Sequence, residues 1–149
     1  MLKNTKTYER SNKIVTIPNL IVTKATKNLY HKLREQGRIT QVNLQNIADL
    51  ICENLGIQPC IISLGGRQPH QHTGQRLKQK TMGNYRASRI SIFKFTAVRQ
   101  KEIAPKTAIS TLLHEINHHI DFALLRLDNS LHTAGFYKRL TYLKNMIAN

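Results

Sequence analysis

Two histidines and a glutamate in residues 111–121 have the types and the spacing to hold a metal ion and to use it. His114, Glu115 and His118 form the pattern H-E-x-x-H. On a helix, residues four apart lie on one face about one turn from each other, so two imidazoles can reach one ion. The Glu115 carboxylate is then placed to take a proton from a metal-activated water, as a general base in hydrolysis. The segment therefore predicts a zinc site on a helix.

Apolar residues around this pattern predict a helix with one buried face. They recur at three- and four-residue steps, and His114 and His118 fall on the opposite side. The apolar stripe consists of Ile109, Leu112, Leu113, Ile116, Ile120, Ala123, Leu124 and Leu127. The alternative is that the histidines are ordinary surface or hydrogen-bonded core residues. The shared face of the two histidines and the glutamate favours the metal.

A catalytic zinc usually takes three protein ligands and leaves a further position for water. No glutamate follows Glu115, which excludes a more distant Glu as the third ligand. Leu124 stands where the compact H-E-x-x-H-x-x-G-x-x-H motif has its third histidine. His132 is the best remaining candidate, and Asp128 is the second choice. Asp121, three residues beyond His118, suits a position behind an imidazole rather than on the ion, and His119 points away from His118.

The reach of His132 is compatible with this assignment. A helix that continues to Leu127 travels about 13 Å past His118, at roughly 1.5 Å per residue. The five residues from there to His132 can return about 16 Å. Residues 128–130, Asp-Asn-Ser, supply turn formers for the reversal.

The same residues resemble a known family. His114-Glu115-x-x-His118, followed by His132-Thr133-Ala134-Gly135-Phe136, is similar to the SprT-like and WLM groups of minimal zinc metallopeptidases. In those groups the third ligand lies in an H-x-x-x-F segment at the start of a helix. Residues 83–85 and 89–92 resemble the family's paired strands, so the resemblance covers about residues 57–147. The chain departs from the pattern at Thr133, where Gly or Asp is usual, and it lacks a cysteine-rich zinc ribbon. The resemblance implies a substrate bound near DNA.

The charge of the chain is strongly positive. Its 149 residues include 23 Lys and Arg against 8 Asp and Glu, a formal net charge of +15. Such a field favours a polyanionic partner, DNA or RNA most simply, or an acidic protein. The alternative is a generally basic protein with no dedicated nucleic-acid surface.

Residues 67–81 are expected to be a polar loop without acidic residues. Its cations could contact a phosphate backbone or cover a cleft. They are Arg67, Arg76, Lys78 and Lys80. His70 and His72 in the same loop are not favoured as a second metal pair, because no suitable third ligand is near.

Cys52 and Cys60 have no ligand spacing with each other or with nearby histidines, and they are expected to be buried thiols in a reducing compartment. Residues 1–13 are polar and basic, unlike a secretory signal or a membrane span. A cytoplasmic location is therefore expected. We expect a basic arm over residues 1–18 and one domain over residues 19–149.

Several further elements follow from the sequence. A helix is predicted over residues 23–36, and a second from an Asn43 N-cap to Leu55, closed by Gly56. Strands are predicted over residues 57–64, 83–86 and 90–95. One helix follows Pro105, and a last one follows His132 and keeps its period to Ile147.

These elements together predict an α+β zincin-like single domain, with a small sheet packed on helices. Its expected activity is peptide-bond hydrolysis with Glu115 as the general base. Tyr137, Arg139 and Tyr142 are candidates to stabilise the oxyanion. A strand edge near the active helix could bind an extended peptide. The alternatives are a nucleic-acid-binding module with a structural zinc, and a toxin or interaction protein whose protease acts on a single target.

Overall fold

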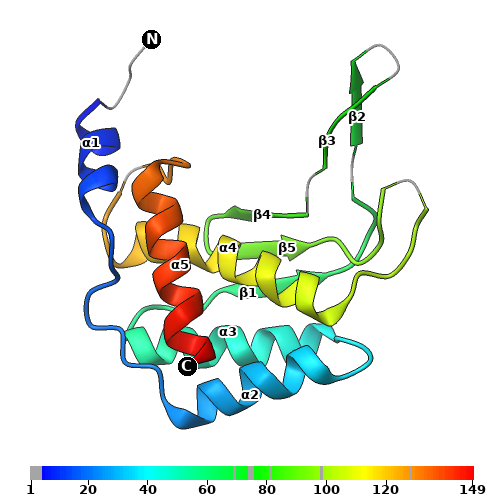
Figure 1. Cartoon of the computed structure of the whole chain (residues 1–149), viewed down its shortest axis with the longest axis horizontal. Coiled ribbons are helices and arrows are strands. Elements are labelled where there is room, and N and C mark those ends of the chain that lie inside the picture. The colour runs from blue at the N-terminus through cyan, green and yellow to red at the C-terminus, as the bar shows by residue number, and fades with distance from the viewer. Residues whose placement is uncertain (1–4, 69, 74–75, 81, 98, 128) are drawn as a thin grey trace.

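The chain has a mixed α+β fold in a computed structural model that describes residues 5–68, 70–73, 76–80, 82–97, 99–127 and 129–149 (Figure 1). This confirms the predicted α+β class. The helices are α1 (Thr5–Lys13), α2 (Lys24–Glu35), α3 (Gln41–Leu55), α4 (Pro105–Ala123) and α5 (Ala134–Ala148). The strands are β1 (Ile61–Leu64), β2 (His70–Thr73), β3 (Arg76–Lys80), β4 (Gly83–Arg86) and β5 (Arg89–Ile92).

Three strands form a mixed sheet beside α4. Their order is β1-β5-β4, with β1 parallel to β5 and β4 antiparallel to it, so β4 is an edge strand. Gly83 lets β4 approach α4 closely, because an added Cβ would lie 2.9 Å from the Thr111 methyl group and 2.8 Å from the Ser91 carbonyl oxygen. The sheet is shorter than expected. β1 begins at Ile61 rather than residue 57, and β5 ends at Ile92 rather than residue 95.

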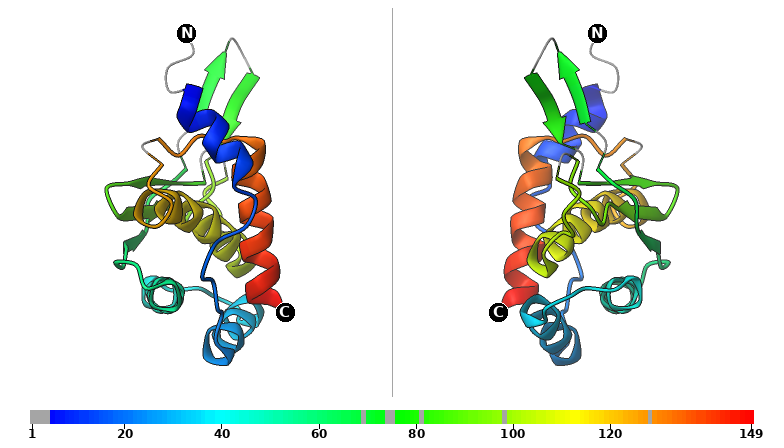
Figure 2. Two further views of the ribbon diagram at one scale, coloured as in Figure 1. Left: turned by 90° about the vertical axis from the view of Figure 1, so that its left-hand side faces the viewer. Right: turned by 90° about the vertical axis from the view of Figure 1, so that its right-hand side faces the viewer.

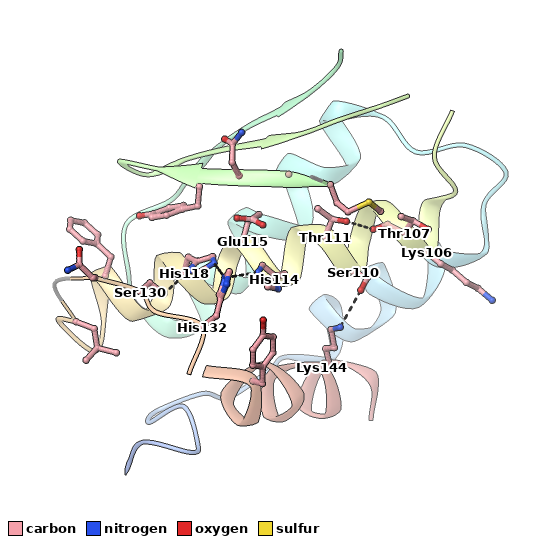
Figure 3. Close-up of a pocket in the computed structure, with 18 of the residues that line it drawn as sticks. Lys106, Thr107, Ser110, Thr111, His114, Glu115, His118, Ser130, His132 and Lys144 are labelled. Atoms are coloured by element: carbon pink, nitrogen blue, oxygen red, sulfur yellow. Dashed lines mark hydrogen bonds between the residues drawn. The ribbon is translucent and has the colours of Figure 1, made fainter. Parts of the chain in front are cut away.

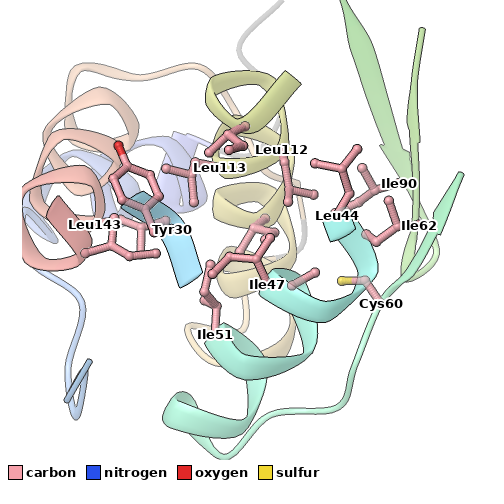
Figure 4. Packing of buried hydrophobic residues seen from close by; sticks show 14 of the residues in the cluster. Tyr30, Leu44, Ile47, Ile51, Cys60, Ile62, Ile90, Leu112, Leu113 and Leu143 are labelled. Atoms are coloured by element: carbon pink, nitrogen blue, oxygen red, sulfur yellow. The ribbon is translucent and has the colours of Figure 1, made fainter. Parts of the chain in front are cut away.

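Helix α4 carries the H-E-x-x-H pattern and lies at the centre of the fold, as Figure 2 shows. Pro105 stands in its first turn, where a missing N–H costs nothing. The predicted apolar face is confirmed, since Ile109, Leu112, Leu113, Ile116 and Ile120 are all buried. They pack against α2, α3, α5 and the sheet (Figure 4). Each such side chain contributes about 1.5–3 kcal/mol by leaving water.

The expected extension of this helix to Leu127 is wrong. Helix α4 ends at Ala123, and Leu124 is its C-cap. The chain then folds back, with the Leu127 N–H donating to the Asp121 carbonyl at 2.9 Å. The reversal toward His132 therefore begins four residues earlier than predicted.

The caps of α3 differ in part from the prediction. Thr40, not Asn43, is the N-cap, and its hydroxyl accepts from the Asn43 N–H at 3.2 Å. Asn43 takes the third position of a capping box, where its side chain returns to the Thr40 backbone. Gly56 closes the helix as predicted, with a φ of 67° that disfavours residues with a Cβ.

The N-terminal segment is not a loose arm from residue 5 onward. Helix α1 packs on α5, and the Arg139 guanidinium donates to the carbonyls of Ser11 and Ile14, each at 2.6 Å. Gly135 makes this contact possible, because any added Cβ would collide with the Ser11 carbonyl oxygen. Ile17 then enters the core. Residues 5–17 are therefore part of the folded domain.

The expected polar loop over residues 67–81 contains an antiparallel ribbon of β2 and β3. The ribbon projects away from the three-stranded sheet (Figures 1 and 2). The side chains of Arg76, Lys78 and Lys80 lie outside what the structure describes, whereas Arg67 is exposed.

Among the described helices, none combines the length and the apolar character needed to cross a bilayer.

Candidate metal centre

The side chains of the three histidines predicted as ligands point toward one another. His132 Nε2 lies 3.0 Å from His118 Nε2 and 3.3 Å from His114 Nε2 (Figure 3). Two nitrogens bound tetrahedrally to one zinc at about 2.05 Å would be about 3.3 Å apart. Both distances are close to this value, and one ligand nitrogen from each of the three histidines lies within 4.8 Å of the others. The structure confirms a candidate metal-binding group with this membership.

Different elements bring the histidines together. His114 and His118 come from successive turns of α4, and His132 comes from the loop before α5. Thr133 caps α5 by accepting from the Phe136 N–H at 3.0 Å, which fixes the start of the helix directly after His132. The buried Phe136 ring packs 4.6 Å from His118 and 5.1 Å from His132 between ring centroids. This aromatic residue holds the imidazoles from one side.

His118 is oriented by a part-buried chain of polar groups. Its Nδ1 lies 2.6 Å from the Ser130 hydroxyl, which donates to Asp121 Oδ2 at 2.7 Å. Because that hydroxyl proton is committed to Asp121, the Nδ1–H of His118 is the donor to Ser130. The Nε2 lone pair of His118 is then left for a metal.

Asp121 is in turn held by Arg139. The guanidinium donates to both carboxylate oxygens, at 3.2 and 3.1 Å, and both side chains are fully buried. Asp121 thus lies behind His118 and reaches it through Ser130, not directly. Ser130 was expected only to form a turn, and sequence gave no signal for its contact with His118.

Burial sets the charge state of the metal-binding face. Desolvation, followed by the neighbouring His114 and His132, lowers the pKa of His118 to about 3. Desolvation, followed by His132 and Lys144, also lowers the pKa of His114. Both imidazoles are therefore neutral at physiological pH, the state that a metal requires.

Glu115 is the carboxylate of this site. Only 6% of the residue is exposed, and burial raises the pKa of its carboxyl group to about 7. It lines the same cleft as the three histidines. A carboxylate with a pKa near neutrality suits proton transfer, and a bound cation would favour its ionised form.

Of the three oxyanion candidates, only Tyr137 lines the cleft. Its ring centroid lies 5.9 Å from that of His132. Arg139 is wrong as an oxyanion group, because its buried guanidinium is committed to Asp121 and the α1 backbone. Tyr142 is partly buried against the core and does not line the cleft, so it is also in the wrong place.

His119 lies away from the site, as predicted, and has a structural role. It is fully buried, with Nδ1 2.9 Å from the Tyr85 hydroxyl and Nε2 2.7 Å from the Gln58 carbonyl. The Tyr85 ring also stacks on His118, at 6.5 Å between centroids. Tyr85 therefore connects β4 to two adjacent histidines of α4, a role that sequence reasoning missed.

Cys52 and Cys60 are free and buried, as predicted, and although their spacing in the sequence indicates no ligand set, the fold places them beside His119. Together with His119 they form a second group whose ligand atoms lie within 4.8 Å of one another. A hydrogen bond from Cys60, the largest influence, lowers the pKa of Cys52 to about 6. Residues far apart in sequence form this cluster, so their spacing could not reveal it. Both His119 nitrogens already have hydrogen-bond partners, which favours a packed polar cluster over a metal site.

Asp128, the second-choice ligand, lies outside the described residues. The nucleic-acid contacts assigned to Arg67, Arg76, Lys78 and Lys80 remain a prediction.

No protein-family model, no curated protein and no solved structure matches this chain.

Proposed function

We propose that this protein is a zinc-dependent peptidase with a zincin-like fold, akin to the SprT-like and WLM groups. One observation supports this most strongly: three imidazole Nε2 atoms converge next to a buried carboxylate, in an open cleft. The three nitrogens come from His114, His118 and His132, and the carboxylate belongs to Glu115. Three ligands and an accessible face are typical of catalytic zinc, whereas structural zinc is usually closed by four ligands.

Zinc held by the three histidines would polarise a peptide carbonyl and acidify a water molecule. Glu115 accepts the proton of the attacking water as its oxygen bonds to the carbonyl carbon. The C–N bond then breaks, and Glu115 returns the proton to the leaving amine. General-base catalysis of this kind contributes about a hundredfold to ten-thousandfold to the rate.

The edge strand β4 offers a place for the substrate. Asn84 and Tyr85 line the cleft together with the α4 histidines. An extended peptide can add to such an edge through main-chain hydrogen bonds, which brings its carbonyl groups over α4. Tyr137, on the opposite wall, is our candidate to donate a hydrogen bond to the oxyanion.

The charge of +15 supports a polyanion as a second partner, and proteins associated with DNA are our proposed substrates. The competing proposal is a nucleic-acid-binding module whose zinc is structural. The two differ in their need for Glu115, since only hydrolysis requires its carboxylate.

The test is proteolysis of denatured casein by zinc-loaded protein, with and without double-stranded DNA, followed by mass spectrometry of the products. We expect new peptide ends that disappear when zinc is removed with a chelator and return when zinc is restored. The absence of cleavage under both conditions, by protein shown to contain zinc, would contradict the proposal and favour the binding module.

A further inference from the structure

The cleft has a cationic end. Lys106 and Lys144 lie at the end beyond His114, as Figure 3 shows, and Arg34 also lines the cleft. Lys144 Nζ donates to the Ser110 hydroxyl at 3.2 Å. Ser110 is one helical turn before His114 on α4, so this lysine acts about 5.4 Å along the helix from the metal-binding face.

Little negative charge balances these cations. Glu115 is the single carboxylate that lines the cleft within the described chain. The ion pairs found among the described residues use Arg38, Lys94 and Arg139, and none involves Lys106 or Lys144. Both ammonium groups are therefore open to an incoming anion.

The direction of β4 determines which residues of a bound peptide lie at the cationic end of the cleft. Gly83 lies against Thr111, whereas Tyr85 stacks on His118, so β4 and α4 run the same way. A peptide added antiparallel to β4 then runs from the His118 end toward the Ser110 end. The residues that follow the scissile bond pass Lys144 and Lys106. An extended substrate advances about 3.3 Å per residue, so the one helical turn of α4 between His114 and Ser110 corresponds to less than two substrate residues.

We propose that Lys144 and Lys106 select a substrate carboxylate located one to three residues after the scissile bond. The inference rests on the proposed peptidase function for the path of the chain. The carboxylate can belong to an Asp or Glu side chain or to the end of the substrate chain. Both sources present the same chemistry to an ammonium group.

The test separates binding from cleavage. Zinc-loaded Glu115→Gln protein, which should bind peptides without cutting them, is immobilised and exposed to randomised octapeptides. The pool is made with free and with amidated C-termini. We expect the retained amidated peptides to be enriched in Asp and Glu by about threefold to tenfold, as a few partly exposed charge pairs would produce. Stronger retention of the free-acid pool than of the amidated pool would support the inference with the chain-terminal carboxylate as the source.

A charge-matched control addresses the general basicity of the protein. Lys144→Glu in the same background should abolish the enrichment, whereas Lys138→Glu on the exposed part of α5 should preserve it, although both change the net charge equally. Lys144→Gln, with a thermal melt, checks that the loss does not come from unfolding. The inference would be overturned if the retained peptides had no excess of Asp or Glu and the free-acid pool were retained no better than the amidated pool. The absence of any retained peptide would also overturn it. The inference would also be overturned if Lys144→Glu and Lys138→Glu reduced the enrichment in Asp and Glu equally.

Cleavage by the wild type supplies an independent readout. New N-termini from the same pool should carry Asp or Glu within their first three residues. Charge-selective retention without any cleavage would support this inference while contradicting the proposed peptidase function. Cleavage with no preference for acidic residues would support the proposed peptidase function and contradict this inference.

Discussion

The Ser130 hydroxyl lies 2.6 Å from Nδ1 of His118, and it donates a hydrogen bond to Asp121. This contact fixes the imidazole in the tautomer that leaves Nε2 available to a metal. It also connects the candidate metal centre to Arg139, and through Arg139 to the backbone of α1. The candidate metal centre is thus supported by the N-terminal helix.

Ser130→Ala should weaken zinc binding by about tenfold to a hundredfold, as is typical when a group that orients a metal ligand is lost. The fold should survive, because the change removes one hydroxyl from a part-buried position. Zinc affinity is measured by competition with a chromogenic chelator. Ser63→Ala, on an exposed position of β1, is the control and should bind zinc like the wild type. Equal affinity in all three proteins would contradict the orienting role.

His132→Ala and His119→Ala should have opposite effects. The first removes an exposed proposed ligand, so zinc content should fall while the zinc-free protein keeps its stability. The second removes a buried side chain with two hydrogen bonds, which leaves the Tyr85 hydroxyl and the Gln58 carbonyl without it. Its free energy of unfolding should fall by about 2 kcal/mol or more, with one zinc still bound. Elemental analysis and denaturant unfolding check both results. Full zinc content in the His132 variant would reject His132 as a ligand.

Arg139→Met should destabilise the fold strongly. It leaves the Asp121 carboxylate buried without its partner, which typically costs about 3–5 kcal/mol. It also releases the Ser11 and Ile14 carbonyls, so the amides of α1 should exchange faster with deuterium. Arg38→Met, which breaks an exposed pair with Glu102, is the matched control and should change stability little. Similar unfolding curves for the two variants would show that the buried pair does not anchor α1.

The helix that carries the site and the grouping of two of its candidate ligands could be predicted because their signals are local. A 3.6-residue apolar period and the i, i+4 spacing place His114 and His118 on one face without tertiary information. His132 followed from elimination and chain reach, even though the assumed helix end at Leu127 was too late by four residues. The early end is stabilised by a tight reversal, in which the last carbonyls of the helix find partners, as the Asp121 carbonyl does in the Leu127 N–H.

The supporting contacts could not be predicted because they join distant segments. Arg139 meets Ser11 across 128 residues, and neither residue carries a local pattern that indicates the other. Residues 5–13 looked like an arm because they are polar, yet α1 is held mainly by polar contacts to α5 and to the loop after α4, including Arg10 with the Arg126 carbonyl at 3.1 Å. Arg139 was assigned to the oxyanion for its nearness to His132 in sequence, but on α5 it points into the protein interior.

The central claim is that Glu115 is the general base of a zinc peptidase. Glu115→Gln keeps the size and helix propensity of the residue and removes the carboxylate that accepts the proton. The most direct measurement is casein cleavage by the wild type and by this variant, at matched zinc content and with matched melting curves. We predict that the variant cleaves at least about a hundredfold more slowly while its zinc content and its DNA affinity at fixed salt are unchanged. Undiminished cleavage by the variant would contradict the account.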